Sequence, residues 1–297
     1  MPLYGAVEAG GTKFVCAVGT GPNDLRAEVR FPTTQPDETL AKTVAFFCEY
    51  MEKTNSSLNS IGIGSFGPLE LNKNAPNFGK ITATPKPGWS YADIANRVQS
   101  ETGIRVIFDT DVNAAALGEG RWGAAQGLSD FIYITIGTGI GGGVIVDAKP
   151  LHGLVHPEIG HMRLPHNFEE DPFTGHCPFH RDCFEGLAAG PALNARYGVR
   201  AETLPPTHPA WELEAKYIAL ALNNLICSIS PQKIILGGGV MQQEHLFPLV
   251  RQKVLEFLNG YVNSPAILEH IETYIVPPAL GNRAGILGSI ALAQQYG

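Results

Sequence analysis

The sequence predicts an α/β protein made of two α/β domains with a cleft between them. The main observation is a pattern that occurs twice: two short strands around a turn rich in glycine and threonine, followed by alternating helices and strands. The two copies share little sequence, so only the pattern repeats. The chain has 297 residues, which is enough for two medium-sized domains, and clefts between domains are common ligand sites.

The first copy opens with three short apolar or alternating runs separated by turn sequences, which is typical of consecutive antiparallel strands. These runs are Leu3–Glu8, Phe14–Gly19 and Leu25–Phe31. Apolar residues at helical spacing predict a helix over Asp37–Asn55, and Ser60–Gly67 has the composition of a buried strand that ends in a loop. A serine N-cap and a glycine stop predict a helix over Ser90–Thr102. A strand over Ile104–Phe108 and a small-residue helix over Val112–Ala125 follow.

The second copy begins with strands over Phe131–Ile136 and Val144–Asp147, on either side of a glycine-rich turn. The stretch Leu151–Cys183, rich in His and Pro, predicts an irregular segment. The elements expected after it are helices over Phe184–Tyr197, Pro209–Ser228 and Ala284–Gln295 and strands over Lys233–Leu236 and His270–Val276, with one further helix between these two strands. We therefore place the N-terminal domain at residues 1–113 and the C-terminal domain at 114–297, and expect the last helix, 284–297, to pack back on the first domain.

Composition and charge narrow the classes of function. Hydrophobic residues make up 44% of the chain and charged residues 16%, which is ordinary for a soluble globular enzyme. A net charge of -7 argues against a nucleic-acid partner, because a phosphate backbone attracts a surplus of Lys and Arg. The sequence contains no apolar run of 18 or more residues, so we expect no membrane span. Five cysteines, an odd number, do not form a disulfide framework, and a cytoplasmic location is expected.

The turn in the second copy, TIGTGIGGGVIV over Thr135–Val146, contains a G-x-G-x-x-G match. A dinucleotide site needs a helix directly after such a loop. Here the next residues, Val144–Val146, are β-branched and favour a strand, so the loop joins two strands instead. A plain hairpin needs fewer glycines. The extra glycines allow a ligand to approach the backbone, and Thr135 and Thr138 offer hydroxyl groups to phosphate oxygens.

The turn in the first copy, EAGGTK, has similar chemistry. It brings a carboxylate, two glycines, a hydroxyl and a lysine to one strand junction. Glu8 is a candidate to hold Mg²⁺ directly or through water, because this ion prefers oxygen ligands. The P-loop pattern G-x-x-x-x-G-K-[ST] does not occur in the sequence. Two such turns, one in each half, predict a phosphate-binding site of another kind.

The irregular segment also predicts a metal site. Six of the nine histidines lie between His152 and His180, together with two of the five cysteines. Within it, Cys177, His180 and Cys183 follow one another with two residues between each pair, a spacing that lets side chains converge on one zinc ion. A fourth ligand must come from elsewhere. The alternative is a set of free buried cysteines among scattered surface histidines.

Four motifs together resemble the ROK family of sugar kinases and repressors, which belongs to the actin-like, ribonuclease-H-like superfamily. They are EAGGTK at 8–13, DVNAAALGE at 111–119, TIGTGIGGG at 135–143 and PEIGHM at 157–162. Their order and spacing fit along essentially the whole chain. The variant EAGGTKFVCAVG, with TPKPGW at 84–89, looks most like the bacterial fructokinase branch. The resemblance implies phosphorylation of a hexose by ATP, with fructose as first choice and fructose 6-phosphate as product. It also implies a homodimer.

The resemblance also implies a catalytic base. By position, Asp111 matches the family's base, and a carboxylate can take the proton of a sugar hydroxyl as the phosphoryl group arrives. The alternative from the residues alone is that Asp111 caps the helix that follows, and Asp109 and Thr110 could cap it equally well. Mannose, glucose and N-acetylated hexosamines remain alternative substrates. A sugar sensor without catalysis is the alternative from another class.

The resemblance extends to binding residues. The sugar contacts it implies are Gly67, Pro68, Glu158 and His161, with Asn113 as a substitute where Thr110 replaces the family's usual Asn. Together with the two turns, the positions expected around ATP are Glu8, Gly10, Gly11, Thr12, Lys13, Thr135, Gly137, Thr138, Gly139, Pro191, Gly237, Gly238, Gly239, Val240 and Met241. The family usually has Asp in place of Glu8, and the longer side chain favours a water-mediated Mg²⁺ contact.

For zinc, the resemblance supplies His161 as the fourth ligand, beside Cys177, His180 and Cys183. The family's usual ligand run has three cysteines, and here His180 replaces one of them. His166 and His176 are the alternatives for the fourth position. Four protein ligands leave no place for water, so the zinc would be structural and would hold the irregular segment in place.

Overall fold

The computed structural model describes residues 2–297 and divides into two compact units. Unit 1 comprises the chain up to Gly127, the segment Pro150–His156 and the C-terminal stretch Ala279–Gly297. Unit 2 comprises Leu128–Lys149 and Pro157–Pro278. Unit 1 thus runs past the boundary expected after residue 113 and also takes up a short segment from the middle of the second copy.

Unit 1 is built on a mixed five-stranded sheet in the order β3-β2-β1-β4-β5. Its strands are β1 (Tyr4–Ala9), β2 (Lys13–Gly21), β3 (Asp24–Pro32), β4 (Ser60–Ser65) and β5 (Val106–Thr110). The first three form an antiparallel meander, whereas β4 and β5 run parallel to β1. The carboxyl ends of β1, β4 and β5 therefore meet at one edge of the sheet, and the segments that follow these strands gather there.

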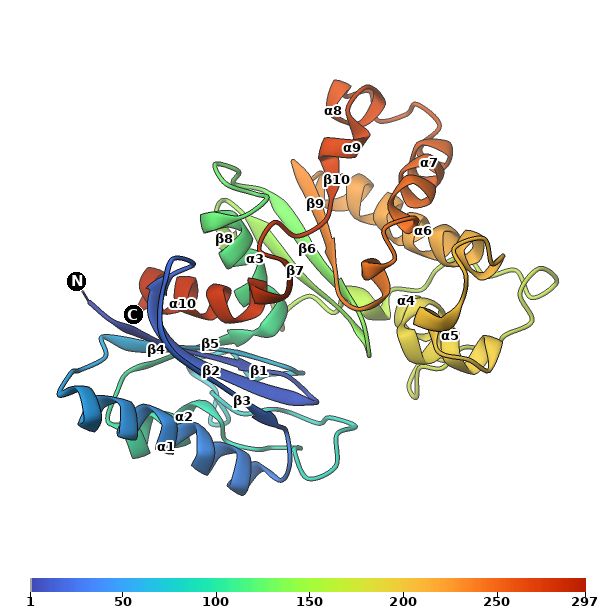
Figure 1. Ribbon diagram of the computed structural model, residues 1–297. Helices are drawn as coiled ribbons and strands as arrows, with labels where there is room; N and C mark the ends of the chain where they lie inside the picture. The colour runs from blue at the N-terminus through green and yellow to red at the C-terminus, as the bar shows by residue number, and fades with distance from the viewer. Residues whose placement is uncertain (1) are drawn as a thin grey trace. The chain divides into compact units, whose positions relative to one another are not determined.

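Helices cover both faces of this sheet (Figure 1). They are α1 (Pro36–Thr54), α2 (Ala95–Thr102), α3 (Asp111–Trp122) and α10 (Ala284–Tyr296). Residues of α1, α2 and the strands form one apolar core. On the other face Ile286, Leu287 and Ile290 of α10 pack on the strands. A Cβ at Gly62 of β4 would lie 2.0 Å from the Ser289 carbonyl oxygen, so glycine is needed for α10 to lie this close to the sheet.

Unit 2 repeats this strand pattern in a sheet ordered β10-β9-β6-β7-β8. Its strands are β6 (Phe131–Ile136), β7 (Ile140–Val146), β8 (Lys149–Pro150), β9 (Lys233–Gly237) and β10 (Ile275–Val276). The pair β6 and β7 is antiparallel, whereas β9 is parallel to both β6 and β10. The glycine turns after β6 and β9 consequently lie at the same edge of the sheet.

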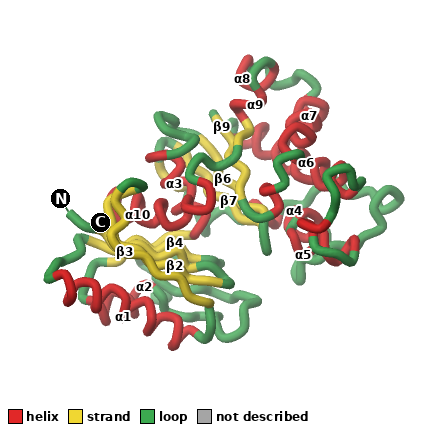
Figure 2. The backbone as a smooth tube through the Cα atoms, viewed as in Figure 1, coloured by secondary structure: helices red, strands yellow, loops and turns green. Residues whose placement is uncertain are grey.

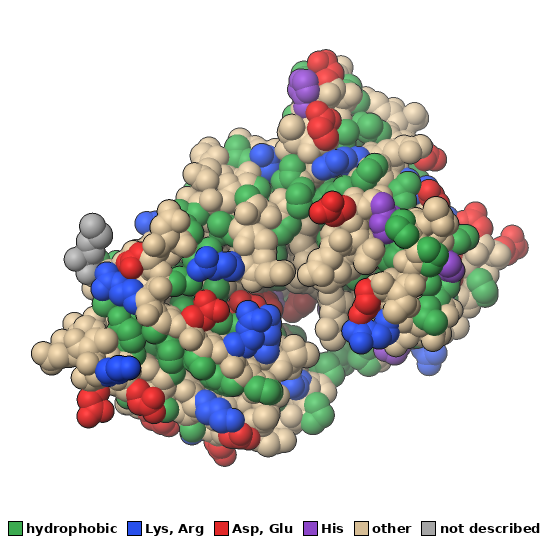
Figure 3. Space-filling model, viewed as in Figure 1, with side chains coloured by type: hydrophobic (Ala, Val, Ile, Leu, Met, Phe, Trp, Pro, Cys, Tyr) green, Lys and Arg blue, Asp and Glu red, His purple; other side chains and the backbone are tan. Residues whose placement is uncertain are grey.

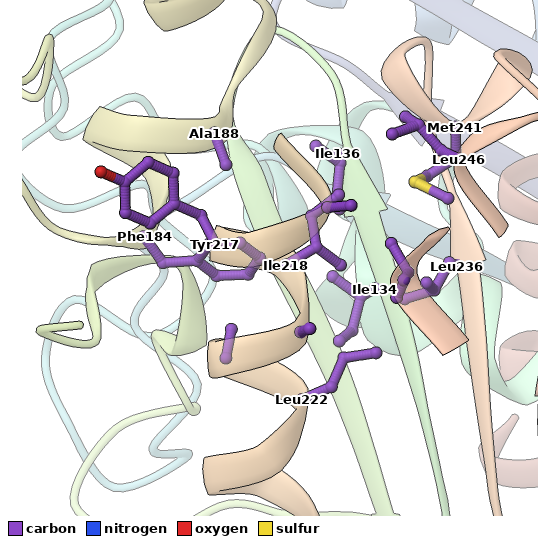
Figure 4. Close-up of a cluster of buried hydrophobic side chains, with 14 of the residues drawn as sticks. Ile134, Ile136, Phe184, Ala188, Tyr217, Ile218, Leu222, Leu236, Met241 and Leu246 are labelled. Carbon is purple, nitrogen blue, oxygen red and sulfur yellow. The ribbon is translucent and has the colours of Figure 1, made fainter. Parts of the chain in front are cut away.

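The helices of unit 2 are α4 (Phe184–Ala188), α5 (Gly190–Tyr197), α6 (Ala210–Ile229), α7 (Leu246–Leu258), α8 (Pro265–Leu268) and α9 (Ile271–Tyr274). Short 3₁₀ turns lie at Ile159–His161, Ala201–Thr203 and Val240–Gln242 of unit 2, and another lies at Gly281–Arg283 of unit 1. Figure 4 shows Ile218 and Leu222 of α6 against Ile134 and Ile136 of β6 in a core that contains more than thirty buried residues. This core holds the strand ends from which the glycine turns emerge.

Four predicted elements were wrong in extent. The strand expected over Val144–Asp147 is β7, which begins earlier, at Ile140, and contains the glycines 141–143 expected in the turn. The helix expected from Ser90 begins only at Ala95, because the Ser90 hydroxyl bonds to the backbone of Thr84 instead of capping a helix. The strand expected over His270–Val276 is mostly the short helix α9, and only its last two residues pair in the sheet. The single helix expected over Phe184–Tyr197 is divided into α4 and α5, since Ala189 has extended backbone angles and a proline opens α5.

The segment Leu151–Cys183 is largely loop, as its composition predicts (Figure 2). Its helical part is the turn Ile159–His161, and isolated bridges join Arg163 to Cys183 and Cys177 to Arg181. On the face shown in Figure 3, Lys and Arg side chains lie among Asp and Glu side chains. Within residues 2–297, the helices are too short or too polar to cross a membrane.

Candidate active site

The N-terminus of α3 decides between the two expected roles of Asp111. Thr110 is the N-cap residue, and its hydroxyl accepts the backbone N–H of Asn113 at 3.1 Å. Asp111 is the first helical residue, and its Oδ1 accepts the neighbouring backbone N–H of Val112 at 2.9 Å. Thr110 is therefore the cap of this helix, and the half-buried Asp111 stands as its first residue at the carboxyl edge of the sheet.

Asp109 lies behind this position in a hydrogen-bonded cluster that sequence reasoning missed. Its Oδ1 accepts the backbone N–H of Thr110 and the side-chain Nδ2 of Asn113, each at 2.7 Å. His152, from the segment Pro150–His156, places its Nε2 within 3.2 Å of the same carboxylate. The hydrogen bond to Asp109 is the main reason that the pKa of His152 lies above its ordinary value. The Asp109 carboxylate thus favours the protonated form of the His152 ring beside it.

The EAGGTK turn joins β1 to β2 at the same edge. Gly10 donates its N–H to the Lys13 carbonyl at 3.0 Å, and a Cβ at Gly10 would lie 2.8 Å from that oxygen, so the tight turn requires glycine. Within 4 Å of a Cβ built on Gly11, the described residues place no atom, and the side chain of Thr12 is exposed. The turn is therefore closed by Gly10 and open at its tip.

Glu8 packs against the first turn of α10. A Cβ at Gly285 would lie 2.7 Å from the Glu8 carboxyl carbon, and the Glu8 carboxylate accepts the backbone N–H of Ile286. Burial raises the pKa of Glu8 above its ordinary value, and the nearby charge of Lys13 lowers it again in part. A carboxylate at a helix N-terminus is favourably placed, because the free N–H groups and the helix dipole attract negative charge.

Gly67 and Pro68 follow β4, and a cis peptide bond joins them. The buried His156 side chain holds this loop: its Nε2 accepts the backbone N–H of Leu69 at 3.1 Å and lies 3.7 Å from where a Gly67 Cβ would be. Unit 1 thus gathers the loop after β4, the EAGGTK turn and Asp111 at one sheet edge. His156 was not predicted, because its partner is far away in the sequence.

Unit 2 contains a pocket of about 560 Å³ between the turns after β6 and β9 and the start of α5. This volume lies within the usual range of pockets for small ligands, roughly 300–1,000 Å³. Of the positions expected around ATP, those that line it are Gly137, Thr138, Pro191, Gly239 and Val240. Asn194, Arg200, Glu202, Gln242 and Gln243 add polar side chains that sequence reasoning missed.

The other positions of unit 2 that were expected around ATP do not line this pocket but lie in the elements that form it. Gly238 has a positive φ of 92°, and a Cβ there would lie 2.3 Å from the Ile136 carbonyl oxygen. Met241 is buried in the apolar core beside Val240. Thr135 pairs with Gly141 inside the β6–β7 hairpin, and Gly237 ends β9 against the Tyr133 hydroxyl. These residues let the two turns approach each other.

Two carboxylates of unit 2 lie near the turn between β6 and β7. Glu185 of α4 accepts the backbone N–H of Ile140 at 2.9 Å, and a Cβ at Gly139 would lie 2.7 Å from the same carboxylate oxygen. Burial, and then the charge of Glu185, raise the pKa of Glu158 to about 7. Gly139 is therefore needed to admit Glu185, a residue that sequence reasoning did not single out.

Four residues of the irregular segment form a compact ligand set. One nitrogen or sulfur atom from each of His161, Cys177, His180 and Cys183 lies within 4.8 Å of all the others. The His161 Nδ1 is 3.7 Å from the Cys177 Sγ and 3.6 Å from the Cys183 Sγ, and the His180 Nδ1 is 3.8 Å from the Cys177 Sγ. Tetrahedral zinc with ordinary bond lengths separates a sulfur and a nitrogen ligand by about 3.6 Å. The geometry fits that ion.

The two alternative histidines lie elsewhere. The His166 ring is buried between two acids, with Nε2 2.9 Å from the Asp171 carbonyl oxygen and Nδ1 3.4 Å from the Asp182 carboxylate. His176 is exposed and lies outside the ligand set found among residues 2–297. His161 is thus the histidine that the fold brings to the two cysteines and His180.

Comparison with known proteins shows the family of the chain. The ROK family profile matches residues 4–296, which is nearly the whole chain. The chain belongs to the ROK family. Within it, the chain is 49% identical to a putative fructokinase of Bacillus subtilis (strain 168), over 99% of this chain and 96% of the relative. It is 45% identical to a fructokinase of Pediococcus pentosaceus, over 98% of both chains.

Solved ROK structures share the fold. A ROK hexokinase from Thermus thermophilus superposes with a TM-score of 0.80 at 27% identity and covers 98% of both chains. A ROK family glucokinase from Streptomyces griseus, in complex with glucose and AMPPNP, superposes with a TM-score of 0.76 at 26% identity over 99% of both chains. The predicted α/β class with two actin-like domains and the family resemblance are both confirmed.

Proposed function

We propose that this ROK protein transfers the γ-phosphoryl group of ATP to a hexose, with fructose as the preferred sugar and fructose 6-phosphate as product. The observation that carries the proposal is the N-terminus of α3, where Thr110 is the cap and Asp111 is the first helical residue, at the carboxyl edge of the sheet. Relatives named fructokinase at 40–49% identity along nearly the whole chain support the choice of sugar.

In the proposed reaction, Asp111 accepts the proton of the sugar hydroxyl while the oxygen of that hydroxyl bonds to the γ-phosphorus of ATP. The bond between that phosphorus and the β–γ bridging oxygen breaks, and ADP leaves with the electron pair. Positioning and electrostatic stabilisation supply most of the rate in such transfers. Lys13 and the N–H groups of the open EAGGTK turn are suited to phosphate oxygens, and the pocket of unit 2 is suited to the nucleoside.

Magnesium bound to the ATP phosphates would neutralise charge that develops during transfer. Glu8 fits a contact through water better than direct coordination, because its carboxylate already accepts the Ile286 N–H at the start of α10. Among residues 2–297, Glu8 does not belong to any group of three or more side chains that could hold a metal ion. Most ligands of the ion would therefore come from phosphate and water, as is usual for Mg²⁺.

The ligand set His161, Cys177, His180 and Cys183 would hold a structural zinc ion. Three separations between a sulfur and a nitrogen of this set, at 3.6–3.8 Å, are close to those of tetrahedral coordination, and both cysteines are buried. His161 would bind through Nδ1, which leaves its Nε2 free to contact a sugar hydroxyl. The ion would also fix the turn that carries Glu158. We further propose a homodimer, from the family resemblance, and a cytoplasmic location, since all five cysteines are free thiols.

A coupled assay of ADP release over a panel of hexoses tests the proposal. Fructose, mannose, glucose and N-acetylated hexosamines would each be supplied with ATP and Mg²⁺, and fructose is expected to give the highest kcat/KM. A higher kcat/KM for mannose or glucose would show that fructose is not the preferred substrate. Sugar binding measured by calorimetry without any sugar-dependent ADP release would instead identify a sensor.

A further inference from the structure

The cluster of Asp109, Asn113 and His152 has an unsatisfied atom at its centre. Asn113 is 1% exposed, and its side-chain Oδ1 has no hydrogen-bond partner among residues 2–297. A buried acceptor without a donor costs roughly 1–3 kcal/mol, so such atoms in native proteins usually await a ligand or a water molecule. Asn113 lies one helical position after Val112 and two after Asp111, in the turn that carries the proposed base.

The orientation of the Asn113 amide follows from its neighbours. An ionised carboxylate only accepts hydrogen bonds, so the amide must turn its Nδ2 toward the Asp109 Oδ1, at 2.7 Å. The Oδ1 consequently faces away from Asp109. The Asp109 carboxylate also accepts the Thr110 N–H, which ties it to the cap of α3. The same Nδ2 lies 3.3 Å from the His152 Nε2, so Asp109 and His152 together set the direction of the free acceptor.

His152 in turn supports Asp109. Asp109 is 4% exposed, and a buried carboxylate is costly unless a charged or hydrogen-bonding partner compensates it. Its carboxylate receives three hydrogen-bonding groups, and His152 is the one among them that can carry a positive charge. The two residues are 43 positions apart in the sequence. The segment Pro150–His156 belongs to unit 1 and contributes His152 and His156 to its hydrogen bonds.

We propose that His152 is a positioning residue for the hexose: through the Asp109 carboxylate it orients the Asn113 amide, whose Oδ1 accepts a hydrogen bond from a sugar hydroxyl. This inference rests on the proposed hexose phosphorylation. The bond selects for a hydroxyl donor at that position of the ring, because a sugar without it leaves the Asn113 oxygen buried and unpaired. His152 acts on the sugar side of the reaction and leaves the ATP side unchanged.

The arrangement depends on pH in a defined direction. Since the pKa of His152 is raised by Asp109, the cationic ring and the compensated carboxylate are present at low pH and are lost as pH rises through that pKa. Asp111, at the start of α3, is the nearest acid in the sequence. Tyr296 of α10 also senses Asp109, whose charge adds to burial in raising the pKa of that phenol.

Two substitutions of His152 and one control test the inference. His152→Ala removes the partner, and His152→Gln keeps a neutral donor, whereas His270→Gln changes an exposed histidine of unit 2. The His152 side chain is 40% exposed, so both variants should fold, which circular dichroism checks. We expect His152→Ala to raise the fructose KM and the calorimetric Kd for fructose about tenfold, the effect of one hydrogen bond. His152→Gln should raise them less, and the ATP KM should stay within about twofold of wild type, well below that tenfold effect.

The pH profile separates positioning from a merely structural effect. In wild type and His270→Gln, fructose kcat/KM should fall on the alkaline side with the pKa that NMR assigns to the His152 imidazole, and this decline should be absent in both His152 variants. If the fructose KM and Kd of His152→Ala were unchanged, the inference would be overturned. The proposed function would stay intact in that case, provided that the wild type phosphorylates fructose. Wild type that binds fructose without releasing ADP, with binding weakened in His152→Ala, would refute the kinase and keep the inference. Wild type that neither binds nor phosphorylates a hexose would refute both.

Discussion

Replacing Asp111 by Asn isolates the proposed proton transfer from the stability of α3. The variant keeps an oxygen that can accept the Val112 N–H at 2.9 Å, and the helix cap is supplied by Thr110 rather than by Asp111. We therefore expect the main loss in the folded state to be the interaction of one negative charge with the helix N-terminus, about 0.3–1 kcal/mol. A protein of this size would then melt within a few degrees of wild type.

Catalysis should respond far more strongly than stability. General-base assistance contributes typically 10²–10⁴-fold, which corresponds to about 2.7–5.5 kcal/mol of activation free energy. We expect kcat for fructose to fall by this range in the ADP-release assay, with ATP binding unchanged by calorimetry. The amide has the size of the carboxylate but cannot take the hydroxyl proton. A kcat within about threefold of wild type, far below that range, would show that another group is the base.

Thr110→Val is the matched control for this prediction. It removes the hydroxyl that accepts the Asn113 N–H at 3.1 Å while keeping the shape of the side chain. Loss of an N-cap costs about 0.5–2 kcal/mol, so this variant should melt several degrees lower yet keep most of its kcat. The two variants thus have opposite signatures. If Asp111→Asn instead lowered the melting temperature as Thr110→Val does, with activity falling in proportion, Asp111 would be a structural residue.

Cys177→Ser should lower the zinc content from about one ion per chain, the value expected for a closed site. It should also raise the fructose KM more than the ATP KM. Cys227→Ser, which changes an exposed free thiol, should alter neither the zinc content nor the fructose KM. Elemental analysis of unchelated wild type that finds well under one zinc per chain would reject the site. Glu214 of α6 is fully buried, its two carboxylate oxygens have no partner among residues 2–297, and burial raises its pKa well above the ordinary value. The folded state then keeps the proton of the Glu214 carboxyl at pH values above 4.5, where the unfolded state releases it. The stability of the wild type should therefore fall as pH rises, and Glu214→Gln should remove that loss. Its gain in melting temperature over wild type should grow from pH 5 to pH 8, whereas the exposed Glu212→Gln should show no such trend; equal gains at both pH values would contradict the assignment.

Much of the fold could be predicted from local patterns. Alternating and apolar runs located the five strands of the first sheet to within a few residues, and glycine turns marked where β1 and β6 reverse. Errors arose where a tertiary contact outweighed a local preference. Ser90 has the residue type of an N-cap, but its hydroxyl bonds to the backbone of Thr84, so α2 begins later. The apolar run before Val276 forms a short helix, because only its last two residues reach β9.

The candidate site divides in the same way. The residue types at 177, 180 and 183 already favoured zinc, and the family motifs supplied His161, since ligand chemistry depends on residue type and close spacing. The sequence left open which residue caps α3, because Asp109, Thr110 and Asp111 all have side chains that make good caps. The backbone geometry shows that Thr110 is the cap. Zinc itself and the roles of the sugar and nucleotide contacts stay predictions.

By itself, the sequence determined the family, the α/β class and the residue types available for phosphate, proton and metal chemistry, because these depend on composition and on motifs of a few adjacent residues. The tertiary structure decided which distant side chains meet. His152 reaches Asp109 across 43 residues, and Glu185 reaches the N–H of Ile140 across 45. Burial, the raised pKa of Glu158 and the unpaired oxygen of Asn113 also arise only there. The physical reason is that desolvation and hydrogen-bond geometry are properties of the packed environment, which chain proximity does not encode.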